Sequence, residues 1–169
     1  MYFQDFVHVM CYDYHGKWDK KTGHNAPLHS RPTEPDEELT MNVEYSLRYL
    51  IKRGALPEKT VLGVPFYGRA FTLENAEHNE MGDPALDTAF QVNVFYKTPL
   101  FMIFVFKGPY SREEGFMGYN EICEELLDEK DPWTSMWEEN HLAPYMYRLG
   151  TEGRNSKFAI LNFFIGNGG

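Results

Sequence analysis

Two pairs of polar side chains follow apolar runs in this sequence and carry the groups best suited to chemistry. Tyr12 and Asp13 end one run, and Tyr67 and Arg69 end another. A phenol donates a hydrogen bond, an ionised carboxylate accepts hydrogen bonds, and a guanidinium donates to oxygens. Taken alone, a Tyr-Asp pair after a strand is also typical of a loop that starts with an Asp turn. The two pairs therefore form a candidate site only if the fold brings them together.

The residues around these pairs predict a strand, a loop, a helix and a second strand, in that order. Residues 6–12 and 60–67 are mostly apolar and indicate buried strands. Between them, a loop rich in turn formers leads into a helix from about Thr40 to Arg53, and Gly54 follows it as a stop signal. Such an order is typical of the crossover unit of a parallel sheet, whose functional residues gather at the carboxyl ends of the strands. The predicted fold class is α/β.

The composition is that of an acidic globular protein. The 169 residues are 43% hydrophobic and 24% charged, which excludes the disordered and fibrous classes. Sixteen basic and 25 acidic residues give a net charge of −9. This charge argues against a nucleic-acid or anionic-membrane partner, because both need a basic surface. Aromatic residues make up 16% of the chain, enough to fill a core or to line a groove for apolar ligand faces.

Three motifs in the sequence point to a known family. The first reads MCYDYHG over residues 10–16 and continues as TGHNAPL over 22–28. The second is GVPFYGRAF over 63–71, and the third is GPYSREEGF over 108–116, followed by YNEIC over 119–123. In this order and spacing they resemble the glycoside hydrolases of family 18, the chitinases and chitinase-like proteins. The residues of the motifs are most similar to those of arthropod chitinases.

The resemblance implies a fragment of a (β/α)₈ TIM barrel, with the first two motifs as about the sixth and seventh strands. We expect a partial barrel over residues 1–69 and an α+β chitinase insertion domain over residues 70–148. Residues 91–107 form an atypical insert and residues 149–169 an atypical tail, because neither matches the family pattern. We interpret both as translated non-coding sequence; the alternative for the insert is a genuine lineage-specific strand.

The resemblance also implies a mechanism, because this family is a substrate-assisted exception among glycosidases. The N-acetyl oxygen of the substrate attacks the anomeric carbon, and the protein holds that acetamide. Tyr12 and Asp13 match the catalytic positions that hold it, the phenol donating to its oxygen and the carboxylate accepting from its N–H. The residues that match substrate-binding positions are Met10, Trp18, Tyr67, Arg69 and Glu113.

Each substrate-binding residue also has a plainer structural reading. Met10 would floor the sugar pocket, but a methionine at a strand end is as often core. Trp18 would stack on a product-side sugar or only cover the rim of the barrel. We expect Arg69 and Glu113 to form an ion pair, which on an open surface would contribute less than about 1 kcal/mol.

The general acid of the family is absent from these residues. The sequence contains no Asp-x-x-Asp-x-Asp-x-Glu pattern, so we expect the chain by itself to be inactive. The predicted parent is a chitinase that hydrolyses β-1,4-linked N-acetylglucosamine in chitin with retention. The alternatives are a chitinase-like lectin that binds chitin or chito-oligosaccharides without cutting them, and a protein-interaction module that has lost sugar binding.

The sequence predicts no metal and no cofactor. Its six histidines are dispersed, and none forms a His-Glu-x-x-His motif or pairs with cysteines at zinc spacing. Cys11 is expected to be a buried, inert thiol, and Cys123 resembles a family cysteine but should be unpaired here. The first residues lack the features of a signal peptide, whereas the resemblance implies an extracellular parent family.

Overall fold

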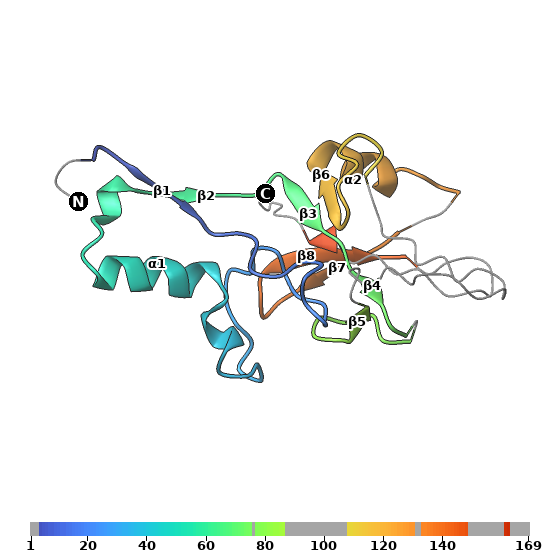
Figure 1. Ribbon diagram of the computed structural model, residues 1–169, viewed down its shortest axis with the longest axis horizontal. Helices are drawn as coiled ribbons and strands as arrows, with labels where there is room; N and C mark the ends of the chain where they lie inside the picture. The colour runs from blue at the N-terminus through green and yellow to red at the C-terminus, as the bar shows by residue number, and fades with distance from the viewer. Residues whose placement is uncertain (1–3, 76, 87–107, 131–132, 149–160, 163–169) are drawn as a thin grey trace, which may run out of the picture.

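The computed structural model describes residues 4–75, 77–86, 108–130, 133–148 and 161–162. The predicted insert at 91–107 lies outside the described residues, as does the tail apart from a two-residue strand. A unit of two strands and a helix lies at one end of the molecule, and a larger sheet with a second helix lies at the other (Figure 1). No helix in the described ranges is long and apolar enough to cross a membrane.

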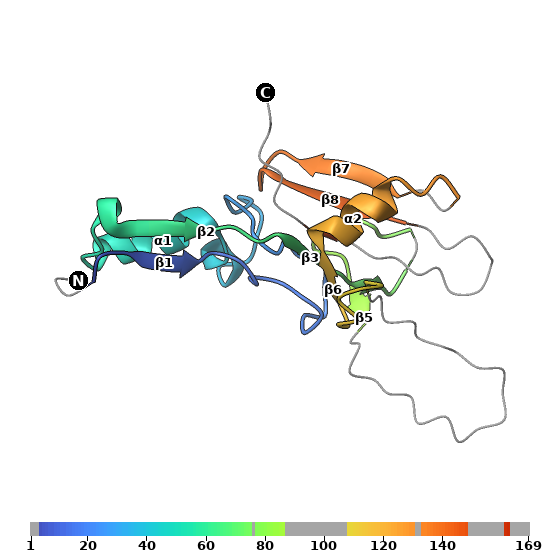
Figure 2. The same ribbon diagram turned by 90° about the horizontal axis from the view of Figure 1, so that it is seen from above.

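The first unit contains the predicted parallel strand pair. Strand β1 (Val7–Met10) runs parallel to β2 (Thr60–Gly63), in a register that pairs Val7 with Thr60 and Met10 with Gly63. Helix α1 (Val43–Lys52) and two 3₁₀ turns, Glu38–Thr40 and Pro57–Lys59, lie in the connection between them. Figure 2 shows the two strands side by side, with their carboxyl ends pointing toward the larger sheet. The strand-helix-strand unit inferred from the sequence is therefore confirmed.

Helix α1 begins three residues later than the sequence predicted. The Asn42 side chain accepts a hydrogen bond of 2.8 Å from the Tyr45 N–H and so caps the first turn, while the residues before it form a 3₁₀ turn. At the other end, Gly54 adopts a positive φ of 99°, as the predicted stop requires. Local capping chemistry thus sets both helix ends.

The second strand is shorter than the predicted run 60–67, which is a correction to the sequence analysis. Strand β2 ends at Gly63, and strand β3 (Tyr67–Arg69) pairs antiparallel with β6 (Phe116–Gly118) in the larger sheet. Pro65 separates the two strands, and a proline has no N–H to donate to a ladder. One apolar run therefore supplies two different sheets.

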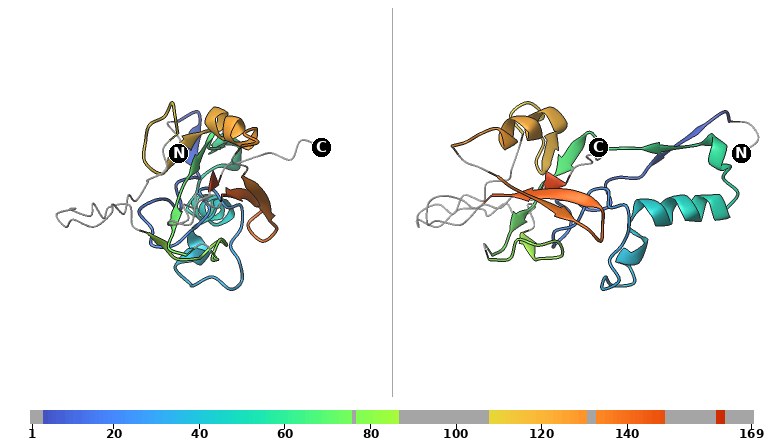
Figure 3. Two further views of the ribbon diagram at one scale, coloured as in Figure 1. Left: turned by 90° about the vertical axis from the view of Figure 1, so that its right-hand side faces the viewer. Right: turned by 180° about the vertical axis from the view of Figure 1, so that it is seen from behind.

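The larger sheet is antiparallel and has the strand order β6-β3-β9-β8-β7. Its remaining strands are β7 (Thr134–Glu138), β8 (Ala143–Tyr147) and β9 (Leu161–Asn162). Helix α2 (Tyr119–Leu126) packs on β3 and β6, and a short ribbon of β4 (Thr72–Leu73) and β5 (Ala85–Leu86) lies beside the sheet (Figure 3). Together, this antiparallel sheet with its helix and the parallel strand pair give the chain an α/β character.

Two apolar clusters hold this part of the molecule together. The first joins α2 to the sheet and contains Ala70, Met117, Ile122, Trp133 and Met146. The second contains Phe71, Leu73, Met81, Ala85 and Tyr145, with Tyr147 packed against it. Ala70 of the first cluster and Phe71 of the second directly follow Arg69 in the chain. Their packing therefore fixes the end of β3, the strand that carries this candidate site residue.

The carboxylate of Glu121 organises the turn that precedes β6. It accepts hydrogen bonds of 2.6–2.7 Å from the backbone N–H groups of Tyr110, Ser111 and Gly118. A Cβ atom at position 108 would clash with this carboxylate, so glycine is needed there. Burial raises the pKa of Glu121, but the N–H donors outweigh burial and hold the pKa below its ordinary value.

We expect the substitution Glu121→Gln to lower the free energy of unfolding at pH 7 by about 2 kcal/mol, because a neutral amide replaces a charged acceptor. The pKa of Glu121 is lower in the folded state, so the unfolded state binds more protons in acid. The stabilisation is present above the unfolded pKa and is lost as pH falls through the folded pKa. Urea denaturation at pH 7 and below pH ~4 measures both effects.

The matched control is Glu124→Gln, an exposed glutamate on the same helix. It should change stability by less than about 0.5 kcal/mol at either pH. A Glu121→Gln effect that is the same at both pH values would contradict the assigned role of the charge.

Candidate functional site

The two predicted pairs of polar residues meet between the parallel pair and the larger sheet, since Tyr12 and Asp13 follow β1 whereas Tyr67 and Arg69 lie in β3. The Asp13 Oδ1 atom accepts a hydrogen bond of 2.7 Å from the Tyr67 hydroxyl and bonds of 2.8 Å from Nε and Nη2 of Arg69. Arg69 Nη1 lies 3.4 Å from Glu113 Oε1, so the ion pair expected from the sequence is present. We call Tyr12, Asp13, Trp18, Tyr67, Arg69 and Glu113 the Asp13 cluster.

Aromatic rings surround the guanidinium of Arg69. Its Cζ atom lies 5.2 Å from the ring centroids of both Trp18 and Tyr67, and 5.5 Å from that of Phe116. Tyr67 also stacks on Phe116 and makes an edge contact with Tyr12. Arg69 is only 11% exposed, whereas Trp18 is 53% exposed. The cluster thus has a fixed cationic centre and an indole open to solvent.

Asp13 and Tyr67 have complementary hydrogen-bonding roles. Burial and the bond to the Asp13 carboxylate both raise the pKa of the Tyr67 hydroxyl, so it stays protonated and donates. The described hydrogen bonds and ion pair of the carboxylate all use Oδ1, and none of them uses Oδ2. A polar N–H group of a ligand could therefore bind at Oδ2.

The backbone of Asp13 has an unusual conformation that a buried side chain stabilises. Its φ is +60°, a left-handed conformation that few non-glycine residues adopt, with aspartate and asparagine the commonest exceptions. The Asn25 Oδ1 atom accepts a hydrogen bond of 2.8 Å from the Asp13 N–H, and Asn25 Nδ2 donates one of 3.3 Å to the Tyr67 carbonyl oxygen. Asn25 is fully buried and links the two segments that form the site.

Met10 is the one predicted site residue outside these contacts. It is the last residue of β1 and is 73% exposed, so it is not core. Among the described residues, the hydrogen bonds and ring contacts that join the Asp13 cluster do not include Met10. Its place on the floor of a sugar pocket stays a prediction.

Sequence reasoning missed Asn25 as a positioning residue, although it lies within the TGHNAPL segment. The signal was available in part, because an asparagine in a loop can bond to nearby backbone groups. Which backbone groups it bonds depends on contacts 12 and 42 residues away.

Neither cysteine forms a disulfide, and Cys11 is buried as expected, with a thiol pKa raised by burial.

The fold and the cluster define an α/β protein in which a carboxylate and a guanidinium meet beyond the carboxyl ends of two parallel strands. The sequence pattern of the Glycosyl hydrolases family 18 matches residues 1–158. The chain therefore belongs to glycosyl hydrolase family 18.

Individual relatives agree with this assignment. The chain is 42% identical over 135 residues to "Probable chitinase 2" of Drosophila melanogaster, a match that covers 79% of this chain and 23% of that protein. The crystal structure of Ostrinia furnacalis Group IV chitinase in complex with allosamidin superposes with a TM-score of 0.72 at 33% identity, covering 95% of this chain and 37% of the other. Human YKL-39, described as a pseudo-chitinase with retained chitooligosaccharide binding, superposes with a TM-score of 0.72 at 29% identity and the same coverage.

We expect Asn25→Ala to lower the free energy of unfolding by about 3 kcal/mol, because it removes two hydrogen bonds and leaves buried backbone groups unpaired. Asn75→Ala is the matched control, since Asn75 also accepts a backbone N–H bond but is exposed, and it should cost less than about 1 kcal/mol. Urea denaturation of both variants measures the difference. Equal losses would show that Asn25 has no special structural role.

Proposed function

We propose that the Asp13 cluster binds N-acetylglucosamine units of chitin, as part of a chitinase-type glycoside hydrolase that cleaves β-1,4 links with retention. The observation that supports this most is the Asp13 carboxylate, whose Oδ1 atom is held by Tyr67 and Arg69 while Oδ2 makes none of the described contacts. A carboxylate fixed in this way is suited to orienting an amide group.

In the proposed reaction the substrate's acetamide is the nucleophile. Asp13 Oδ2 accepts the acetamide N–H, and the Tyr12 phenol donates to the carbonyl oxygen, so that this oxygen is held for attack on the anomeric carbon. The bond from the anomeric carbon to the leaving sugar oxygen breaks as the new C–O bond forms. The leaving oxygen then needs a proton from an acid, and the 169 residues contain no match to the family's acid motif.

The remaining residues of the cluster would position the sugar chain. The exposed indole of Trp18 offers a flat apolar face for the C–H groups of a pyranose ring, and Arg69 and Glu113 offer a donor and an acceptor for hydroxyl groups. Met10 is exposed and precedes Asp13 by three residues, and its side chain would add an apolar surface to the floor of the sugar pocket. We propose an extracellular location for the protein of which this chain is a part, by analogy with other members of family 18.

A chitin-binding lectin is the second candidate function. It is favoured by the absence of the acid motif here and by the likeness to YKL-39, a pseudo-chitinase that binds chitooligosaccharides. Sequencing the transcript upstream of the codon for Met1 separates the two candidates. An Asp-x-x-Asp-x-Asp-x-Glu motif would support the hydrolase, and the same motif without its final glutamate would support the lectin.

We expect the purified chain to bind chitotetraose without releasing reducing ends, and Asp13→Asn to weaken this binding by at least about tenfold. Asparagine keeps the left-handed backbone but removes the charge. Isothermal titration measures the dissociation constant, and a reducing-end assay on the same samples measures cleavage.

Asp36→Asn is the matched control for this experiment, because Asp36 is exposed on a loop outside the Asp13 cluster. Its affinity for chitotetraose should equal that of the unchanged chain. If the unchanged chain does not bind the sugar, or if both variants bind it equally well, the Asp13 cluster is not its binding site and the interaction-module alternative is favoured.

A further inference from the structure

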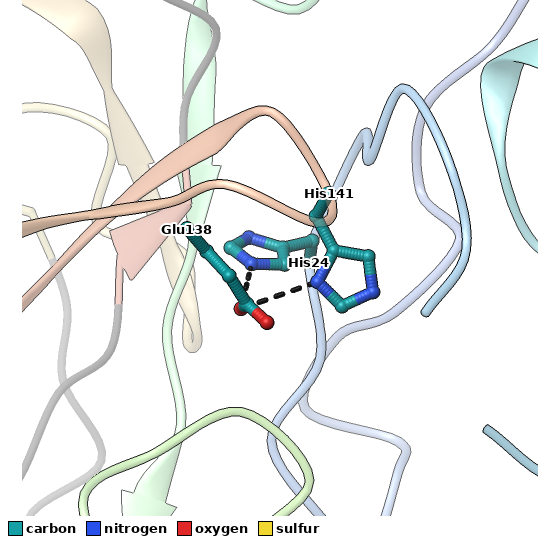
Figure 4. Close-up of side chains that lie close together, drawn as sticks. All are labelled: His24, Glu138 and His141. Atoms are coloured by element: carbon teal, nitrogen blue, oxygen red, sulfur yellow. Dashed lines mark hydrogen bonds and ion pairs between the residues drawn. The ribbon is translucent and has the colours of Figure 1, made fainter. Parts of the chain in front are cut away.

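The side chain of His24, in the loop after β1, meets two ionisable side chains of the β7–β8 hairpin, Glu138 and His141. His24 Nε2 lies 2.9 Å from Glu138 Oε2, and His141 Nδ1 lies 3.1 Å from the same oxygen. Figure 4 shows both imidazole rings directed at this carboxylate. His24 is in the loop that follows β1, Glu138 ends β7, and His141 lies in the turn before β8.

The three groups are well buried. The side chain of His24 is 0% exposed, that of His141 is 5% and that of Glu138 is 16%. Their ligand atoms all lie within 4.8 Å of one another. Zinc binds histidine nitrogen and carboxylate oxygen at about 2.0–2.2 Å, so tetrahedral ligand atoms lie roughly 3.3 Å apart, close to both measured distances. Two histidines and one carboxylate are also a common donor set for this ion.

The position of His141 between two carboxylates gives the strongest indication that a cation binds here. Its Nε2 atom lies 2.6 Å from Glu34 Oε1, which is a short hydrogen bond. A neutral imidazole has a single N–H, so when Nε2 donates to Glu34, Nδ1 carries a lone pair. That buried Nδ1 forms no hydrogen bond with the described residues, although Glu138 Oε2 is near. With His141 neutral, this lone pair and Glu138 Oε2 converge on one point, and His24 Nε2 contacts the same oxygen through a hydrogen bond.

We propose that His24 Nε2, Glu138 Oε2 and His141 Nδ1 bind a divalent transition-metal ion, with Zn²⁺ the best match to the donor set. The proposal departs from the sequence-based prediction of no metal, because the two histidines are distant in sequence and only the fold unites them. It is independent of the proposed function, since none of its three ligands belongs to the Asp13 cluster.

The surroundings of the three ligands suit such an ion. The bond from His141 Nε2–H to Glu34 would fix the tautomer that presents Nδ1, as carboxylates bonded to zinc-binding histidines do. Arg31 Nη1 lies 3.4 Å from Glu138 Oε1, the oxygen not used for the ion. With neutral histidines, Arg31, Glu34 and Glu138 carry a net charge of −1, which a bound cation offsets.

A small cavity beside the histidines provides space for a fourth ligand. Its volume is about 10 Å³, enough for about one water molecule. The walls include His15, Thr22, His24, Arg31, Glu34 and His141. The ion would therefore have three protein ligands and one water, and its role here is structural, because it joins the loop after β1 to the β7–β8 hairpin.

The test uses the full 169-residue chain made without a histidine tag, stripped with a chelator and dialysed against Zn²⁺. We expect about one Zn²⁺ per chain by mass spectrometry of the metal, and a melting temperature that rises with Zn²⁺ concentration. The variants His141→Gln and Glu138→Gln should each reduce the bound zinc about tenfold. Cobalt in place of zinc should give the visible absorption of a four-coordinate ion.

The matched control is His78→Gln, which removes an exposed histidine outside the group and should bind zinc as the unchanged chain does. His141→Gln could unfold the chain, so Glu138→Gln, which keeps the shape of the side chain, is tested beside it. Circular dichroism checks that both variants are folded. The proposal is overturned if the chain takes up no zinc, if both variants retain it, or if His78→Gln loses it equally. It is also overturned if zinc leaves the melting temperature unchanged while stability falls as the histidines lose their protons.

Discussion

The buried side-chain amide of Asn25 is the contact on which the geometry of the site depends. It bonds the backbone of Asp13 on one side and that of Tyr67 on the other. The left-handed backbone of Asp13 is intrinsically unfavourable by about 1 kcal/mol, and the bond to Asn25 offsets that cost. With its backbone fixed, Asp13 presents Oδ1 to Tyr67 and Arg69, and Arg69 in turn lies among the aromatic rings. Each later contact requires the earlier ones.

Local sequence signals predicted the parts of the fold that local chemistry decides. The parallel strand pair and helix α1 follow from an apolar run, a helical period and a glycine stop, and the structure contains them. The run 60–67 was misjudged because hydrophobicity alone does not show where a proline divides one strand into two. Packing decided the outcome, since β3 finds its partner β6 almost 50 residues further along the chain.

The candidate site was predicted in its residue types but not in its support. Asp13, Tyr67 and Arg69 were recognised because motifs place them at strand ends, and the structure brings them into contact. Asn25 and the group formed by His24, Glu138 and His141 depend on contacts between residues up to 117 positions apart, and no local pattern records these. The residue types of the candidate site are thus indicated locally in the sequence, whereas the contacts that support them are formed at long range.

Orientation of the substrate and proton donation are separate tasks in glycoside cleavage, and the proposed role of the Asp13 cluster concerns the first alone. The chain matches family 18 over most of its length, yet it spans only 23% of the Drosophila relative and 37% of the solved Ostrinia chain. His24 and Asn25 are consecutive residues that engage different groups, the β7–β8 hairpin and the Asp13 backbone. A ligand that orders one of them also restricts the other through a single peptide unit. Binding at the two places would then be linked, and each ligand would change the affinity of the other by the same factor.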